Sequence, residues 1–223
     1  MFLTYLFNNP QLYVYWIVII VFSICVHEFS HALVAYWQGD DTAKQKGYFT
    51  INPMVQMGKI SLLCVLIFGL CWGACPVDPT KMKHKYSDAL VSFAGPFSNF
   101  VLSAIFTLFA LLTYKYYNTS ILANNISRFF EIAAYVNATL GVFNLIPLPP
   151  LDGSKIMAYI IPKAEDFYVK IGGNGFVFLF LALTIFPKLN DILWGSGTFF
   201  VNSMAMFYSL IYYLFKGIIA AIF

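Results

Sequence analysis

A short motif of ionisable residues lies inside the first long apolar run of the chain. The motif H-E-F-S-H occupies His27 to His31, and the run extends from residue 12 to residue 37. Side chains four positions apart project from one face of a helix, so His27 and His31 can bind the same metal ion. Glu28 follows about 100° further around the helix axis, where its carboxylate can reach a water on that metal. Two imidazoles, a carboxylate oxygen and an open fourth position are typical of a catalytic zinc site.

The apolar surroundings argue against a chance occurrence of this motif. The run from residue 12 to residue 37 exceeds the roughly 20 residues that a helix needs to span a bilayer. An ionisable side chain at the centre of such a helix costs roughly 2.5–3.5 kcal/mol on the insertion scale, and a bound metal would compensate that cost. Lys44, Lys46 and Lys59 follow the run. Their charges predict a cytoplasmic loop and an N-terminus outside, which places the motif in the cytoplasmic half of the span.

A catalytic zinc needs a third protein ligand, and Asp152 is the best candidate. Three prolines between residues 147 and 150 prevent a regular helix before it, and Gly153 frees the backbone directly after it. Such an unwound stretch can aim a carboxylate at a metal. The alternative is that Asp152 caps a helix beginning at Gly153 or Ser154. The other groups near apolar segments are Asp88, Glu131, Asp191 and His84.

The composition excludes several classes of protein. Of the 223 residues, 60% are hydrophobic and 10% are charged, whereas soluble domains have roughly 45–50% and about 25%. Intrinsic disorder is excluded by the same numbers. A nucleic-acid-binding protein is not expected, because the net charge is only +3 and the 13 basic residues are scattered. The chain is expected to be a single membrane domain, residues 1–223.

The apolar runs predict an all-α polytopic membrane protein with about five or six transmembrane or re-entrant helical segments. The catalytic core is expected over about residues 12–155, and C-terminal helices over about 174–223. The runs after the first cover residues 60–75, 86–114, 129–146, 176–186 and 199 to the C-terminus.

The run from residue 60 to residue 75 has only 16 residues, and lysines flank it on both sides, which a simple crossing would not favour. A re-entrant segment that returns to the cytoplasmic face would explain both facts; a short tilted span is the alternative. Non-helical backbone at this depth would have to line a cavity. Cys71 and Cys75 would share a helix face four positions apart, and we interpret them as small apolar side chains rather than a thiol metal site.

The chain resembles the site-2 proteases, the intramembrane zinc metalloproteases of peptidase family M50, in the small prokaryotic form without a PDZ domain. The resemblance rests on the H-E-x-x-H motif and on two further blocks. The first is Gly95-Pro96-Phe97-Ser98-Asn99, and the second is the N-x-x-P-x-x-P-L-D-G pattern from Asn144 to Gly153.

This resemblance implies that Asp152 is the third zinc ligand and Glu28 the catalytic base. It implies that Asn144 and Asn99 lie near the substrate and support the oxyanion. It also implies a short membrane-inserted β-loop over residues 72–79. Many relatives have a lysine before the Pro-Val of this loop, where this chain has Cys75.

The expected function is hydrolysis of peptide bonds in or near transmembrane segments, for regulated intramembrane proteolysis or for clearance of membrane stubs, with one Zn²⁺ per chain. The expected partners are a transmembrane protein substrate and the lipid bilayer; a homo-oligomer or a regulatory membrane partner is left open. The expected location is the cell (inner or cytoplasmic) membrane, as a multi-pass protein.

Two alternatives are a zinc-binding membrane transporter and a catalytically silent helix-binding protein. A transporter needs a series of ligands across the membrane, but the chain has only three histidines. A silent protein would have lost Glu28 or a ligand, and all of these residues are present.

Overall fold

The computed structural model describes residues 2–171, 175, 185 and 187–222, and within them every regular element is a helix. This agrees with the all-α prediction; the short β-loop is not formed as a strand within these residues. The elements are η1 (Phe2–Thr4), α1 (Tyr5–Asn8), α2 (Pro10–Trp37), α3 (Thr42–Gln45), α4 (Pro53–Gln56), α5 (Gly58–Phe68), η2 (Pro79–Lys81), α6 (Ser87–Tyr114), α7 (Ile121–Asn144), α8 (Asp152–Ile160), α9 (Lys163–Ile171) and α11 (Pro187–Ile222).

Helix α2 carries the H-E-x-x-H motif, and its start follows from local sequence. The Asn9 side chain accepts a hydrogen bond from the Leu12 backbone N–H, and Pro10 occupies the first turn, where its missing N–H is not needed. At 28 residues and 1.5 Å per residue, the helix is about 42 Å long. Among the described residues, α2 and α6 are long and apolar enough to cross a membrane. The larger number of spans expected from the sequence stays a prediction.

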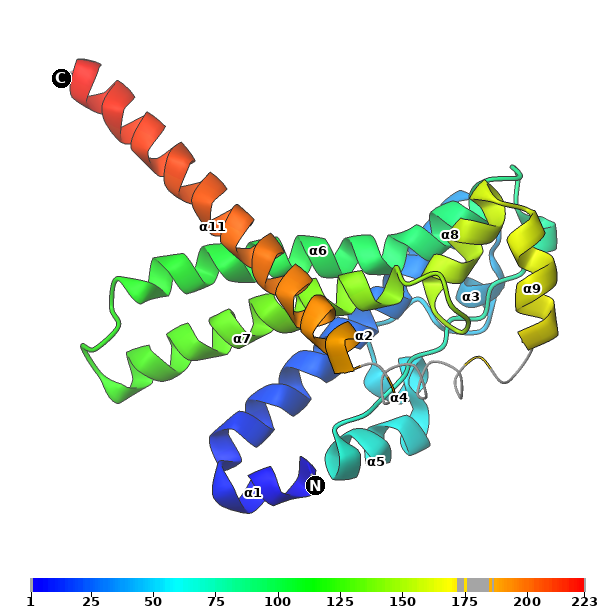
Figure 1. The fold of residues 1–223 in the computed structure, drawn as a ribbon, viewed down its shortest axis with the longest axis horizontal. Helices are drawn as coiled ribbons and strands as arrows, with labels where there is room; N and C mark the ends of the chain where they lie inside the picture. Colours follow the sequence, from blue (N-terminus) through cyan, green and yellow to red (C-terminus); the bar gives the residue numbers. More distant parts are fainter. Residues whose placement is uncertain (1, 172–174, 176–184, 186, 223) are drawn as a thin grey trace.

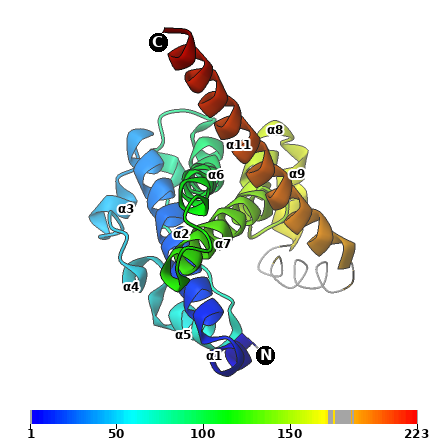
Figure 2. The same cartoon turned by 90° about the vertical axis from the view of Figure 1, so that its left-hand side faces the viewer.

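Helices α6 and α7 form a long hairpin, and α11 packs across it (Figure 1). Small residues let the two hairpin helices approach closely: a Cβ on Gly141 of α7 would lie 2.9 Å from the Phe100 ring of α6. The hydroxyl of Ser103 on α6 donates to the Ala134 carbonyl of α7 over 2.8 Å. Helix α2 packs against α6, and α8 also contacts α6 (Figure 2). Helix α6 of the hairpin therefore contacts both α2, which carries the H-E-x-x-H motif, and α8, which begins at Asp152.

The apolar run at residues 60–75 begins as a helix and then reverses direction. Helix α5 has only 11 residues and ends at Phe68; the next residue, Gly69, has a φ of 71°, the left-handed conformation that glycine favours. Residues 70–78, here called the return segment, then run without regular structure back along the molecule. The Ala74 backbone N–H donates to the Gln56 carbonyl over 3.0 Å. The chain thus comes back beside the residues that precede α5, as a re-entrant segment would and a tilted span would not.

Buried polar groups hold the return segment at both ends. The Ser61 hydroxyl donates to the Trp72 carbonyl (2.6 Å) and accepts from the Trp72 backbone N–H (2.9 Å). The fully buried Asp40 carboxylate accepts from the Asp78 backbone N–H over 2.7 Å. Cys71 and Cys75 lie in this segment rather than in a helix, so the shared helix face expected for them is wrong.

The C-terminal part differs from the sequence expectation in extent. Helix α11 begins at Pro187, twelve positions before the expected start of the last apolar run. The expected run at residues 176–186 lies almost entirely outside the described residues. Two short helices, α8 and α9, fill the region between residues 152 and 171.

Candidate metal centre

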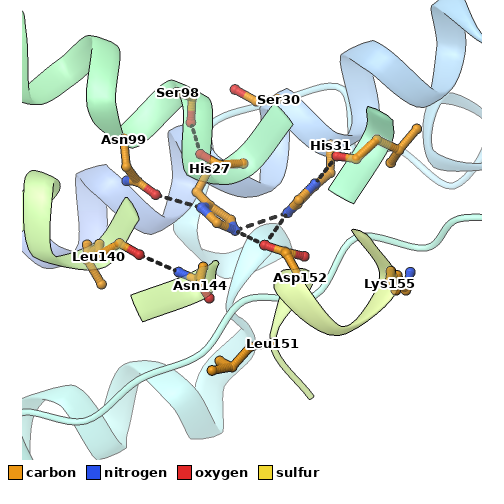
Figure 3. A network of polar contacts seen from close by, with 12 residues as sticks. His27, Ser30, His31, Ser98, Asn99, Leu140, Asn144, Leu151, Asp152 and Lys155 are labelled. Atoms are coloured by element: carbon orange, nitrogen blue, oxygen red, sulfur yellow. Dashed lines mark hydrogen bonds and ion pairs between the residues drawn. The ribbon is translucent and has the colours of Figure 1, made fainter. Parts of the chain in front are cut away.

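The structure brings together His27 and His31 of α2 and Asp152 at the start of α8 (Figure 3). The two imidazole Nε2 atoms lie 3.0 Å apart. The Oδ2 atom of Asp152 lies 3.1 Å from Nε2 of His27 and 3.4 Å from Nε2 of His31. Among the described residues, these three side chains form a group that could hold a metal ion. Both imidazoles are buried, and the carboxylate is half-buried.

The triangle of ligand atoms has the size of a zinc site. With zinc–ligand distances of about 2.0–2.1 Å, the edge of a coordination tetrahedron is about 3.3 Å. The three observed edges, from 3.0 to 3.4 Å, bracket this value. Three such ligands leave a fourth corner of the tetrahedron open, which is the arrangement of catalytic rather than structural zinc.

Hydrogen bonds on the far side of each imidazole prepare both rings for a metal. Nδ1 of His31 lies 2.7 Å from the Val91 carbonyl oxygen, which can only accept, so this nitrogen carries the proton. Nδ1 of His27 lies 2.7 Å from Oδ1 of Asn99. With the proton on Nδ1, each neutral ring presents a lone pair from Nε2. Two lone pairs and a carboxylate oxygen then face one another, and a cation between them resolves their repulsion.

Gly95 of α6 leaves room for this centre. A Cβ on residue 95 would lie 2.4 Å from Nε2 of His31 and 2.5 Å from Nε2 of His27. Any side chain here would occupy the space around the ligand atoms. The glycine of the Gly95-Pro96 block is therefore explained by close approach of the α6 backbone to the metal centre.

The Asp152 carboxylate lies against the two imidazoles and does not cap a helix. Helix α8 begins at Asp152 itself, its N-cap residue is Leu151, and no side chain caps it. Residues 145–151 form turns and bends without a helix, as the prolines predicted. The other groups considered lie elsewhere. Asp88 forms an ion pair with Lys155, and the other three, Glu131, Asp191 and His84, are exposed.

Glu28 lies beside the metal centre under the return segment. Its side chain is buried, with 9% exposure, and it is within electrostatic reach of His27 and Asp152. The Gly73 backbone passes so close that a Cβ there would lie 2.4 Å from Oε1 of Glu28. The Glu28 carboxylate is thus enclosed by the return segment.

The two asparagines expected near the substrate take different positions. Asn99 is buried (1% exposed), with its Oδ1 on His27 and its Nδ2 on Asn137. Because both ends of the amide are engaged, this geometry favours an orienting role for Asn99 over oxyanion support. Asn144 is drawn beside the same group of residues in Figure 3, and its Nδ2 donates to the Leu140 carbonyl over 3.0 Å.

Asn137 is a polar residue of the site that sequence reasoning missed. It lies in the middle of the apolar helix α7 and is fully buried. Its position in the sequence could have indicated this role, because an amide inside an apolar helix needs a hydrogen-bond partner.

Comparison with known proteins adds independent support. The model of peptidase family M50 matches residues 15–121 and 111–185. The protein named "Putative zinc metalloprotease YwhC" from Bacillus subtilis is 34% identical over 197 residues, covering 85% of this chain and 89% of its own length. "Putative zinc metalloprotease Rip2" from Mycolicibacterium smegmatis is 28% identical over 178 residues, covering 75% of this chain and 65% of its own.

An archaeal relative is more distant. "Zinc metalloprotease MJ0392" from Methanocaldococcus jannaschii is 24% identical over 188 residues, which cover 82% of this chain and 45% of the relative. No solved structure matches the chain. The family match covers most of the chain, and the most extensive of these relatives aligns over nearly its full length. The chain therefore belongs to peptidase family M50, which confirms the resemblance to the site-2 proteases and the prediction that it is a metalloprotease.

Proposed function

We propose that this chain is an intramembrane zinc metalloprotease that hydrolyses peptide bonds in or near transmembrane segments of other proteins. The observation that carries the proposal is the convergence of His27, His31 and Asp152, at edges of 3.0–3.4 Å, inside a helix bundle built around an apolar span. One Zn²⁺ per chain fits this ligand set.

Each residue of the centre has a role that follows from its position. Bound zinc supplies a water of lowered pKa and polarises the scissile carbonyl. Glu28 accepts the proton of the attacking water and delivers it to the leaving amine. The proton stays on Nδ1 of both imidazoles, because the oxygens of Asn99 and Val91 face those atoms. Asn144 is the asparagine that we propose contacts the substrate.

The return segment offers an edge for an extended substrate. In extended backbone, successive residues direct their N–H and C=O groups to opposite sides. Trp72 and Ala74 bond to Ser61 and Gln56 on one side. An extended course of these residues would turn the backbone groups of Gly73 and Cys75 to the opposite side, and Glu28 lies against Gly73. A transmembrane helix that unwinds locally could add as a strand to this edge, which would expose its peptide bonds to hydrolysis.

We propose a cytoplasmic-membrane location with the N-terminus outside and the centre toward the cytoplasmic half. Lysines support this orientation, because they flank the re-entrant unit of α5 and the return segment on both sides, at Lys44, Lys46 and Lys59 and again at Lys81, Lys83 and Lys85. Because this unit begins and ends on the same side, both groups of lysines can lie at one cytoplasmic face. Residues 1–223 act as one domain with the catalytic core at about 12–155. Regulated intramembrane proteolysis and clearance of membrane stubs are both compatible with this function. Self-association and binding of a regulatory membrane partner are compatible with it as well.

The direct test uses Glu28→Gln, which keeps the shape of the side chain and removes the base. Wild-type protein and the variant are co-expressed with a single-span membrane protein, and cleavage and zinc content are both measured. We expect the variant to keep its zinc and lose cleavage by at least 100-fold. Full cleavage by a zinc-loaded variant would contradict the role of Glu28.

The transporter alternative has a separate test. Within the described residues, the ligand group of α2 and α8 has no second group to pass an ion to. We therefore expect no zinc flux above background in proteoliposomes containing the wild-type chain. Flux that is lost in a His31→Ala variant would support transport.

A further inference from the structure

A line of buried amides runs from the metal centre into the α6–α7 hairpin. Oδ1 of Asn99 lies 2.7 Å from Nδ1 of His27, and Nδ2 of Asn99 donates to Oδ1 of Asn137 over 3.2 Å. Nδ2 of Asn137 in turn donates to the Ala133 carbonyl over 2.9 Å. The line crosses three helices, α2, α6 and α7. Both asparagines are essentially inaccessible, at 1% and 0% exposure, so water cannot replace either partner.

The direction of each hydrogen bond in this line is set from its inner end. The Ala133 carbonyl can only accept, so Asn137 must turn its NH₂ group toward Ala133 and its oxygen toward Asn99. Asn99 then has to turn its own NH₂ group toward Asn137, which leaves its oxygen facing His27. An oxygen at this position requires the proton of His27 on Nδ1. The lone pair of His27 is therefore directed from Nε2 toward Asp152 and His31.

His31 needs no such arrangement. Its Nδ1 contacts the Val91 carbonyl oxygen directly, and a backbone carbonyl cannot exchange a donor for an acceptor. The side-chain amide of Asn99 can, because rotation by 180° would present NH₂ to Nδ1 of His27. Among the described residues, the partner that distinguishes the two orientations is Asn137, which gives α7 an influence on one ligand but not on the other.

We propose that Asn137 is a positioning residue, which fixes the orientation of the Asn99 amide and thereby the metal-binding tautomer of His27. This inference rests on the proposed function, since it concerns the affinity of the same metal centre. Partners of metal-bound histidines beyond the ligands themselves contribute about 10–100-fold to metal affinity. Loss of Asn137 should therefore weaken zinc binding although its side chain touches no ligand.

The experiment measures zinc affinity of the purified full-length chain in detergent by competition with a chelator. Asn137→Leu keeps the branched arrangement of side-chain heavy atoms but has no polar group, so Asn99 loses the partner that orients it. We expect zinc affinity to fall about 10–100-fold, with an altered visible absorption spectrum when Co²⁺ is bound. Asn137→Asp keeps an oxygen facing Asn99, and as the neutral acid its hydroxyl can donate to the Ala133 carbonyl, so this variant should recover most of the affinity. If the leucine variant does not fold, Asn137→Ala removes the amide without adding bulk, and the same loss is expected.

Ser103→Ala is the matched control. It removes another fully buried hydrogen bond between the same two helices, from Ser103 of α6 to the Ala134 carbonyl of α7, without touching Asn99. We expect its zinc affinity to equal that of the wild type even if its thermal stability falls.

The outcomes separate this inference from the proposed function. A wild-type chain that binds no zinc would overturn the metal centre itself. A wild-type chain that binds zinc together with an Asn137→Leu variant of equal affinity would overturn the positioning role alone. An equal loss of affinity in Ser103→Ala and Asn137→Leu would assign the effect to helix packing and would likewise overturn it.

Discussion

The backbone of Gly73 lies against the carboxylate of Glu28, so that a Cβ on residue 73 would be 2.3 Å from Cγ and 2.4 Å from Oε1. This approach joins the return segment to the proposed catalytic base. Hydrogen bonds from the segment to the Ser61 hydroxyl and the Gln56 carbonyl also hold it in place. In the proposed mechanism, one contact therefore relates the position of the base to that of the substrate edge.

Gly73→Ala should lower the rate of cleavage without removing zinc. The added methyl group must push away either the Glu28 side chain or the return segment, and a displacement of about 1 Å can lower a rate by about 100-fold. Cleavage of a single-span substrate and zinc content of the purified protein are the measurements. Gly195→Ala is the control, because a Cβ there meets nothing within 4 Å. Unchanged cleavage in Gly73→Ala would show that the segment does not constrain Glu28.

Gly95→Ala should act on the metal rather than on the base. Its methyl group would lie 2.4–2.5 Å from both Nε2 atoms, in the space around the ligands. We expect zinc content well below one per chain and loss of cleavage together, whereas Gly73→Ala loses cleavage alone. The two glycine variants thus distinguish damage to the metal site from damage to the base. Wild-type zinc content in Gly95→Ala would contradict the close approach of α6 to the imidazoles.

Asp40→Asn should loosen the return segment where it leaves the site. The carboxylate accepts hydrogen bonds from the backbone N–H groups of Thr42 and Asp78, one on each oxygen. An amide keeps only one of these oxygens, so one buried N–H loses its partner, at a cost of about 1–3 kcal/mol. Hydrogen exchange at the Asp78 amide should accelerate. Asp41→Asn, which removes an exposed ion pair with Lys81, should leave that exchange rate unchanged.

The same carboxylate predicts a dependence on pH. Burial alone raises the pKa of Asp40, but hydrogen bonds from Thr42 and Asp78 outweigh it, so the pKa lies below its ordinary value of 3.8. Because the folded pKa is the lower one, the stabilisation is fully present above pH 3.8 and is lost as the pH falls through the folded pKa. The opening equilibrium at the Asp78 amide, obtained from exchange rates corrected for intrinsic rates, should therefore not change between pH 5 and 7. Greater opening at pH 5 than at pH 7 would contradict this contribution.

The local features of the centre could be predicted because they depend on short-range geometry. The spacing of His27 and His31 places both on one helix face whatever surrounds the helix. The prolines before Asp152 break the helix by the loss of backbone N–H groups and by sterics. These prolines, Gly153 and the family resemblance together indicate Asp152 as the third ligand, and the structure places its carboxylate beside the imidazoles.

The contacts between distant segments could not be read in the same way. Asn99 was expected near the substrate, but which side of α6 faces α2 depends on packing of the whole bundle. The pairing of Asn99 with Asn137 joins residues 38 positions apart on two helices, and no local pattern encodes that register. Cys71 was placed on a helix because the run is apolar, whereas α5 ends at Phe68 and Gly69 turns the chain back.

Zinc content of the purified chain and of its Asp152→Asn variant tests most directly whether two helix side chains and one distant carboxylate bind a single ion. Asparagine keeps the size of the side chain but replaces an anionic ligand by a neutral amide. The account predicts one Zn²⁺ per wild-type chain and, at matched zinc and chelator concentrations, less than about a tenth of that in the variant. Equal zinc content and equal affinity in the two proteins would contradict it.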